Sequence, residues 1–100
     1  MPSQFDLELE FDWDTGNLDK NQLKHQVNQK EAEEAFLDPT GLRSKDPIHS
    51  RVEDRWLLLG QTSQNRQLAI FFTLRKMKIR VVSARPMSRK ERHKYENQKI

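Results

Sequence analysis

The chain has no cysteine, and it has only three glycines and four prolines among its 100 residues. The lack of cysteine excludes a disulfide framework, a thiolate metal site and a cysteine nucleophile, and it fits a reducing cytoplasm. The glycines stand apart, which excludes a glycine-rich loop that holds the phosphates of a nucleotide. No segment approaches the roughly 18 apolar residues of a membrane span, and the start of the chain lacks the features of a secretory signal. We therefore expect a cytoplasmic protein that no membrane anchors.

Metal-ligand patterns are also missing from the sequence. The three histidines, His25, His49 and His93, fall in different parts of the chain and have no ligand spacing between them. There is no His-Glu-x-x-His motif and no cluster of carboxylates. We expect neither a metal nor another cofactor.

Charge is distributed unevenly along the chain. Residues 1–50 carry 5 Lys/Arg against 11 Asp/Glu, a net charge of −6. Residues 51–100 carry 13 Lys/Arg against 4 Asp/Glu, a net charge of +9. Cations at this density repel one another unless a phosphate-bearing ligand or an acidic partner neutralises them. The second half is therefore where a polyanion is expected to bind.

The first half of the chain predicts a strand followed by two helices. Apolar and acidic residues alternate over Leu7–Trp13, which is typical of a strand with its apolar residues toward the core. A first helix is expected from Asp14 to about His25. Asn28 and Glu31 form a capping box that begins a second helix, which Asp38-Pro39 ends.

The second half predicts three strands and a final helix. Residues 40–54 form a loop with a short edge strand near Leu42, and three antiparallel strands follow: Arg55–Gln61, Gln67–Leu74 and Met77–Ala84. The connection at Arg75-Lys76 lacks the Asn or Gly of a tight turn, which favours a longer turn or a bulge. Ser88 caps a polar C-terminal helix that only Tyr95 anchors, so weak docking is expected. The prediction is one α+β domain over residues 1–100, with a three-stranded meander at its core.

Four arginines lie on or next to the predicted strands: Arg55, Arg75, Arg80 and Arg85. A guanidinium donates two charge-assisted hydrogen bonds to a phosphate and keeps its proton, so it stabilises the charge of a phosphoryl transition state. A salt bridge or a solvated charge explains any one of them equally well, whereas the group of four favours phosphate binding. Lys24 and Lys78 are further candidates for contacts to the phosphates of a polyanion.

Two residues are candidates for a general base. His25 follows Lys24, and a neighbouring cation favours the neutral, basic form of its imidazole. A helix C-cap is the alternative role of His25. Glu53, which lies just before the first core strand, is the other candidate, whereas Glu91 is needed by the capping box of Ser88.

The chain resembles the BrnT-type toxins along nearly its whole length. The resemblance is carried, in order, by Phe11-x-Trp13-Asp14, Asn21-x-x-Lys24-His25-x-Val27, Glu31-Ala32, Phe36-x-Asp38-Pro39, Glu53-x-Arg55, Gly60, the segment Ile79–Pro86, Glu91 and Tyr95. Three features depart from the family pattern. Gln26 replaces a glycine, Asn17 replaces a lysine, and the last hairpin lacks a glycine.

The resemblance implies a fold like that of the RelE and ParE toxins, a ribonuclease activity that stops translation, and neutralisation by a BrnA-type antitoxin with a DNA-binding domain. On this basis we expect a metal-independent endoribonuclease that uses Arg55, Arg80 and Arg85, and that meets DNA only through its antitoxin. The antitoxin is expected to cover Arg80, Arg85 and the last helix, including Arg89, Arg92 and Tyr95. The alternatives are a non-catalytic nucleic-acid-binding module, a degenerate toxin that only binds its antitoxin, and a pure protein-interaction subunit.

Overall fold

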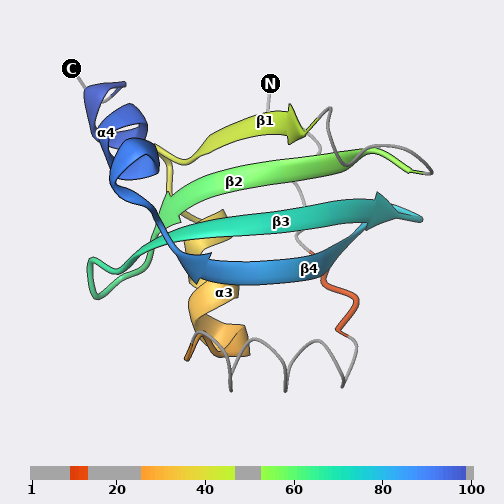
Figure 1. Ribbon diagram of the computed structural model, residues 1–100. Coiled ribbons are helices and arrows are strands. Elements are labelled where there is room, and N and C mark those ends of the chain that lie inside the picture. Colours follow the sequence, from red (N-terminus) through yellow and green to blue (C-terminus); the bar gives the residue numbers. More distant parts are fainter. Residues whose placement is uncertain (1–9, 14–25, 47–52, 99–100) are drawn as a thin grey trace.

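The computed structural model describes residues 10–13, 26–46 and 53–98. The predicted first helix, with Asn17, Lys24 and His25, lies outside the described residues, as does His49. The elements that are described form an α+β structure in the order α3, β1, β2, β3, β4 and α4 (Figure 1).

The centre of the molecule is a four-stranded antiparallel sheet with the order β1-β2-β3-β4. Its strands are β1 (Leu42–Asp46), β2 (Arg55–Gln61), β3 (Gln67–Arg75) and β4 (Lys78–Pro86). The three predicted core strands are confirmed to within two residues at their ends. The short edge strand expected near Leu42 is a five-residue strand that pairs with β2 along its whole length, so the sheet has four strands and not three.

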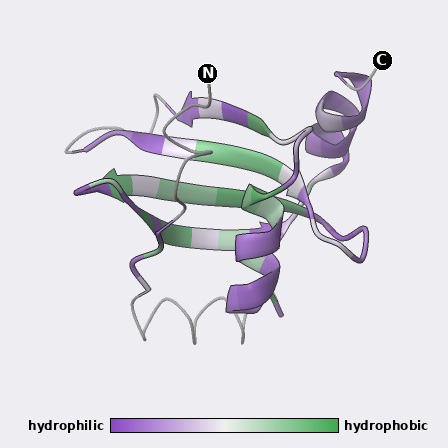
Figure 2. Ribbon diagram, turned by 180° about the vertical axis from the view of Figure 1, so that it is seen from behind, coloured by the Kyte–Doolittle hydropathy of each residue, from purple (hydrophilic) through white to green (hydrophobic). Residues whose placement is uncertain are grey.

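Helix α3 (Gln29–Phe36) covers one face of the sheet. Asn28 and Glu31 form the expected capping box: the Asn28 side chain accepts from the Glu31 amide at 2.8 Å, and the Glu31 carboxylate accepts from the Asn28 amide at 3.2 Å. Ala32, Ala35 and Phe36 are buried against the sheet. Figure 2 shows α3 in front of the apolar stretches of the strands, which form the main core.

Gly60 in β2 allows this close packing. A Cβ atom built on Gly60 would lie 2.5 Å from the backbone oxygen of Ala35. Real Cβ contacts are essentially never this short, so the helix sits where a side chain on β2 would otherwise be.

Residues 10–13 extend the core beside β4. Phe11 forms a parallel bridge with Ile79, and its ring stacks on that of Trp13 with 5.9 Å between the centroids. The indole nitrogen of Trp13 donates to Glu33 on α3 at 2.8 Å. The prediction that Phe11 and Trp13 face the core is confirmed, and the rest of the predicted strand, residues 7–9, lies outside the described residues.

The connection between β3 and β4 is a tight two-residue turn, contrary to the expected longer turn. Arg75 pairs directly with Lys78, and the two residues between them, Lys76 and Met77, have φ angles of 52° and 67°. Positive φ at both positions is the geometry that matches the twist of a hairpin, although neither residue is a glycine or an asparagine. The irregularity in the pairing lies further along, opposite Phe71 and Phe72.

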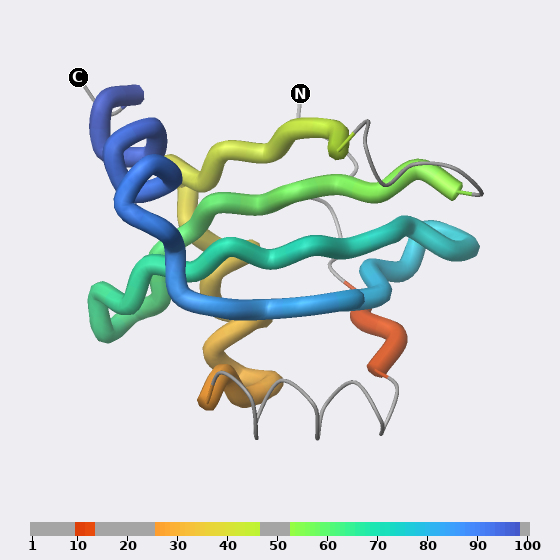
Figure 3. Tube along the Cα trace, viewed as in Figure 1, coloured from red at the N-terminus to blue at the C-terminus, as the bar shows by residue number. Residues whose placement is uncertain are grey.

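Helix α4 (Arg89–Asn97) lies beside the ends of β1 and β2 after the chain leaves β4 (Figure 3). The Ser88 and Glu91 capping box is confirmed. Tyr95 is the expected anchor, but it attaches the helix more firmly than a polar helix suggests. Its ring is fully buried, and its hydroxyl donates to the Asp38 carboxylate.

Asp38 connects three elements at the point where α3 ends. Its carboxylate accepts from the Tyr95 hydroxyl, from the Thr40 amide at 2.9 Å and from the Gln61 amide at 2.8 Å. Partial burial alone would raise the pKa of Asp38, but the hydrogen bonds from Tyr95, Thr40 and Gln61 outweigh it and lower the pKa. Asp38 therefore remains an anion that holds α4 to the sheet.

Candidate nucleic-acid interface

The sheet has a second face, opposite α3, which we call the open face. Side chains alternate between the two faces of a strand, and residues paired across antiparallel strands share a face. Because Leu58, Ile70 and Phe72 belong to the core that includes α3, their neighbours along the strands lie on the open face. The open face comprises Leu42, Ser44, Asp46, Arg55, Leu57, Leu59, Gln61, Gln67, Ala69, Phe71, Thr73, Arg75, Lys78, Arg80, Ser83 and Arg85.

Helix α4 covers one end of this face. Leu59, Ala69, Met87 and Tyr95 form a small second core beneath the helix. The opposite end carries Arg55, Arg75, Lys78 and Arg80, whereas Arg85 lies opposite Ala69 beside α4. The open face therefore divides into an apolar end under α4, which Arg85 borders, and a charged end.

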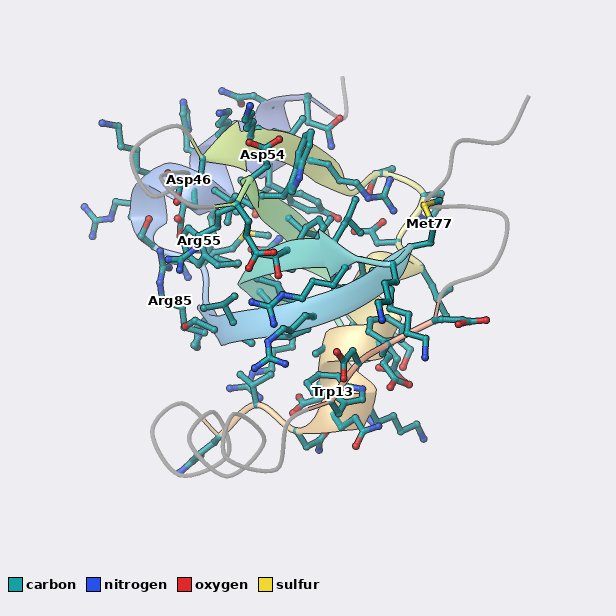
Figure 4. All side chains as sticks on the ribbon, turned by 90° about the vertical axis from the view of Figure 1, so that its right-hand side faces the viewer. Trp13, Asp46, Asp54, Arg55, Met77 and Arg85 are labelled. Carbon is teal, nitrogen blue, oxygen red and sulfur yellow. The ribbon has the colours of Figure 1, made fainter. Side chains whose placement is uncertain are left out.

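The register brings all of the predicted strand cations to the open face. Arg55 and Arg80 lie on either side of Thr73, Arg75 lies opposite Lys78, and Arg85 lies opposite Ala69. Figure 4 shows Arg55 and Arg85 on the side of the sheet away from α3, whereas Trp13 lies beside α3. Cations that are spread over 30 residues of sequence thus share one surface.

Arg75 is engaged by Glu53. The Glu53 carboxylate accepts from Arg75 Nη2 at 2.7 Å and from Nε at 3.2 Å. These hydrogen bonds lower the pKa of Glu53. A lowered pKa makes a carboxylate a weaker base at neutral pH, which disfavours Glu53 as the general base. His25, the other candidate, lies outside the described residues.

Arg85 is engaged by Glu91 in the first turn of α4. Its two terminal nitrogens donate to the two carboxylate oxygens at 2.7 and 2.9 Å. The same hydrogen bonds lower the pKa of Glu91 and raise that of Arg85. The guanidinium carbon also lies 5.5 Å from the centre of the Phe71 ring. Arg85 therefore joins β4 to α4, and an anion that binds it competes with Glu91.

Arg80 and Arg55 belong to a row of residues that crosses the sheet. From β1 to β4 the row runs Asp46, Arg55, Thr73, Arg80. Asp12 lies beyond Arg80, with 3.9 Å between its carboxylate and Arg80 Nη1. Two cations therefore stand next to the centre of the row, and two carboxylates stand at its ends.

The sequence did not single out Thr73, which occupies the centre of the row. It is 4% exposed, and its hydroxyl has no hydrogen-bond partner in the structure as described. A buried hydroxyl without a partner costs about 1–3 kcal/mol, so such groups are rare in folded proteins. One feature of the sequence could have identified Thr73. It stands two residues before Arg75 in an apolar strand, so both side chains lie on the same face of the sheet.

The candidate antitoxin contacts on α4 differ in accessibility. Arg89 and Arg92 are exposed on the helix, whereas Tyr95 is fully buried. A partner reaches Tyr95 only by displacing α4. Between α4 and β2 lies a groove of about 710 Å³ whose lining includes Leu57 and Leu59 from the sheet and Lys90, His93 and Lys94 from the helix.

Two further properties concern the described part of the chain only. Residues 10–13, 26–46 and 53–98 contain no group of three or more His, Asp or Glu side chains placed to hold a metal ion. Neither of the helices described here is long and apolar enough to cross a membrane.

Comparison with known proteins agrees with the resemblance found in the sequence. The family model described as the ribonuclease toxin BrnT of a type II toxin–antitoxin system matches residues 13–91. The fold is similar to the crystal structure of the Brucella abortus ribonuclease toxin BrnT, with a TM-score of 0.61 and 21% identity, over 82% of this chain and 100% of that chain. No curated protein matches the chain. From the extent of the family match, we conclude that the chain belongs to the BrnT family of ribonuclease toxins of type II toxin–antitoxin systems.

Proposed function

We propose that the chain is an endoribonuclease toxin that needs no metal and binds RNA on the charged end of the open face. The observation that carries this proposal is the gathering of Arg55, Arg75, Lys78, Arg80 and Arg85 on one side of the sheet. A rigid sheet holds such groups in fixed positions, as the stabilisation of a transition state requires.

In the proposed reaction, the 2′-hydroxyl of a nucleotide attacks the adjacent phosphorus while the 5′-oxygen of the next nucleotide leaves. A base removes the proton of the 2′-hydroxyl, the leaving oxygen takes up a proton, and the product ends in a 2′,3′-cyclic phosphate. Arg55 and Arg80 contact the phosphate oxygens and stabilise the charge that develops on them. His25 is the preferred base, because Glu53 is engaged by Arg75.

The remaining cations assist these two. Arg75, Lys78 and Lys24 contact flanking phosphates, and Arg85 takes part once RNA competes with Glu91 for its guanidinium. Such contacts add affinity that falls as the salt concentration rises.

The test is cleavage of a short RNA by the purified protein in excess chelator, compared with a 2′-deoxy analogue of the same sequence. We expect cleavage of the RNA only, a cyclic phosphate end, and loss of cleavage in Arg80→Ala. Lys30→Ala is a matched control, because Lys30 is an exposed cation on α3, away from the open face. Loss of cleavage in chelator that magnesium restores would contradict the mechanism.

The second candidate is a non-catalytic module, or a degenerate toxin, that binds nucleic acid on the same face. The ion pairs of Arg75 and Arg85 favour it, because both guanidiniums already have carboxylate partners. Salt-dependent binding of RNA and the 2′-deoxy analogue without cleavage of either would support this second function.

We further propose that a BrnA-type antitoxin with a DNA-binding domain neutralises the toxin by covering Arg80, Arg85 and α4, so that the toxin meets DNA only through its partner. Arg89 and Arg92 are the exposed cations that an acidic segment of the antitoxin contacts first. Reversal of both charges should weaken binding to the BrnA-type antitoxin by more than about tenfold, since rim charges of this kind steer association. Lys30→Glu should leave that binding unchanged.

A further inference from the structure

Thr73 lies between the two arginines that the proposed mechanism uses. Its cross-strand partner on β2 is Arg55, and its partner on β4 is Arg80. Residues paired directly across antiparallel strands have their Cβ atoms about 4.5–5.5 Å apart. The hydroxyl therefore stands within the reach of both guanidinium groups, in the middle of the charged end of the open face.

The threonine hydroxyl contributes nothing to the fold as described. It is buried, and it makes no hydrogen bond with the described residues. Valine has the same shape, suits a strand equally well and has no hydroxyl to desolvate. A buried polar group without a partner calls for a reason, and a ligand that is absent from the free protein is one such reason.

The neighbouring charges identify the class of that ligand. Arg55 and Arg80 place positive charge on both sides of Thr73, and Asp46 and Asp12 stand at the outer ends of the row. The Glu53 carboxylate, which Arg75 engages, is also close enough to interact electrostatically with both arginines. Within the row, the charged residues directly next to Thr73 are therefore both cations. A ligand that accepts hydrogen bonds from two guanidiniums and one hydroxyl is an oxyanion. Because Thr73 is only 4% exposed, binding of such a ligand to its hydroxyl requires the side chains around it to move.

We infer that the Thr73 hydroxyl is a direct ligand of the RNA phosphate that Arg55 and Arg80 hold, and that it positions this phosphate at the centre of the open face. The choice of RNA as the source of the phosphate rests on the proposed function. The anion site itself does not depend on the proposed function, because it is inferred from the row of residues across the sheet.

The test compares Thr73→Val and Thr73→Ser with a matched buried threonine. The Thr62 hydroxyl, also buried, accepts from the amides of Arg66 at 3.1 Å and Gln64 at 3.3 Å. Thr62→Val removes a hydroxyl that the fold uses, whereas Thr73→Val removes one that it does not. Binding of inorganic phosphate, and of a 2′-deoxy oligonucleotide, is followed by NMR of the amides in β3 and β4. Thermal midpoints are measured without phosphate.

We expect Thr73→Val to weaken phosphate binding by about tenfold or more, as the loss of a charge-assisted hydrogen bond does, and to melt at or above the wild-type temperature. Thr73→Ser should bind as the wild type does. Thr62→Val should melt at a lower temperature and bind phosphate normally. Wild-type phosphate binding by Thr73→Val, or a midpoint lowered as in Thr62→Val, would overturn the inference.

The two proposals fail separately. A protein that binds phosphate through Thr73 but cleaves no RNA contradicts the proposed ribonuclease activity and leaves the anion site standing. If the wild type cleaves RNA and Thr73→Val binds phosphate and the oligonucleotide normally, only the role of Thr73 is contradicted.

Discussion

Replacing Arg85 with alanine separates a structural arginine from a purely RNA-binding one. Arg85 donates two short hydrogen bonds to Glu91, and Glu91 also accepts from the Ser88 amide at 2.8 Å at the start of α4. The substitution therefore removes the connection between β4 and the first turn of the helix. The partly buried Glu91 carboxylate then keeps only its contact with Ser88 in the capping box.

The expected loss of stability follows from the exposure of the pair. Hydrogen bonds to charged groups contribute about 1.5–3 kcal/mol when they are well shielded. The Arg85 and Glu91 side chains are 32% and 19% exposed, so solvent screening reduces this contribution to about 1–2 kcal/mol. For a domain of this size the thermal midpoint should fall by roughly 4–16 °C.

The loss should also depend on pH. The folded pKa of Glu91 is lowered, so the contribution of the pair is fully present above the ordinary glutamate value of about 4.3 and is lost as the pH falls through the lowered pKa. The difference between wild type and Arg85→Ala should therefore shrink in acid. Arg85→Lys should lie between them, because lysine keeps the charge but not the paired geometry.

Urea denaturation at pH 7 and at several acid pH values measures these differences. Arg89→Ala is the control, since Arg89 is an exposed cation on the same helix and should change stability by less than about 0.5 kcal/mol. If Arg85→Ala is as stable as Arg89→Ala at pH 7, the ion pair with Glu91 is not structural. Arg85 would then be as free for RNA as its place on the open face suggests.

Three further substitutions test the packing around the site. Met77→Gly should stabilise the protein by about 0.5–1 kcal/mol in urea denaturation, because glycine relieves a positive φ; Met77→Ala, which keeps the Cβ, should not. Gly60→Ala should cost more than about 2 kcal/mol, because its Cβ meets the Ala35 oxygen, and an unchanged midpoint would show that α3 can shift freely. Tyr95→Phe should lower stability by about 1–3 kcal/mol at neutral pH, because it removes the hydrogen bond to the Asp38 carboxylate. The loss should be smaller in acid, where Asp38 becomes protonated below its lowered pKa. A difference in stability that stays constant across pH would refute the role of this contact.

Much of the fold follows from local sequence patterns. The two capping boxes predict where α3 and α4 begin, and the continuous apolar run of β3 predicts a strand that is buried in the middle of the sheet. The turn at Lys76 and Met77 could not be predicted in the same way. Its left-handed geometry is imposed by the pairing of β3 with β4, against the local preference of both residues.

Strand β1 and the segment at Gln26 are two further places where local sequence patterns do not predict the structure. Leu42 is the only apolar residue in β1, so the strand owes its length to pairing with β2 and not to its own pattern. Gln26 stands where the family has glycine, and its φ of 55° shows why a glycine suits this position.

The candidate site was predictable as a set of residues but not as a geometry. Clustering in the sequence identifies Arg55, Arg75, Arg80 and Arg85, and the alternation of strands places them on one face. It does not reveal that Arg75 and Arg85 are paired with carboxylates, because Arg75 of β3 meets Glu53 in the segment before β2, and Arg85 of β4 meets Glu91 of α4. Thr73 is informative only through its two cross-strand neighbours, which depend on the register.

The contact between Tyr95 and Asp38 has a consequence for folding kinetics. The two residues are 57 positions apart in the chain, but once the sheet has formed, Asp38 is held at the end of β2 and α4 follows β4 directly. Closing this contact then orders only a short loop, so it costs little chain entropy and follows the formation of the meander. Loss of the Tyr95 hydroxyl should therefore leave the folding rate nearly unchanged and accelerate unfolding, the behaviour of a contact that forms after the transition state.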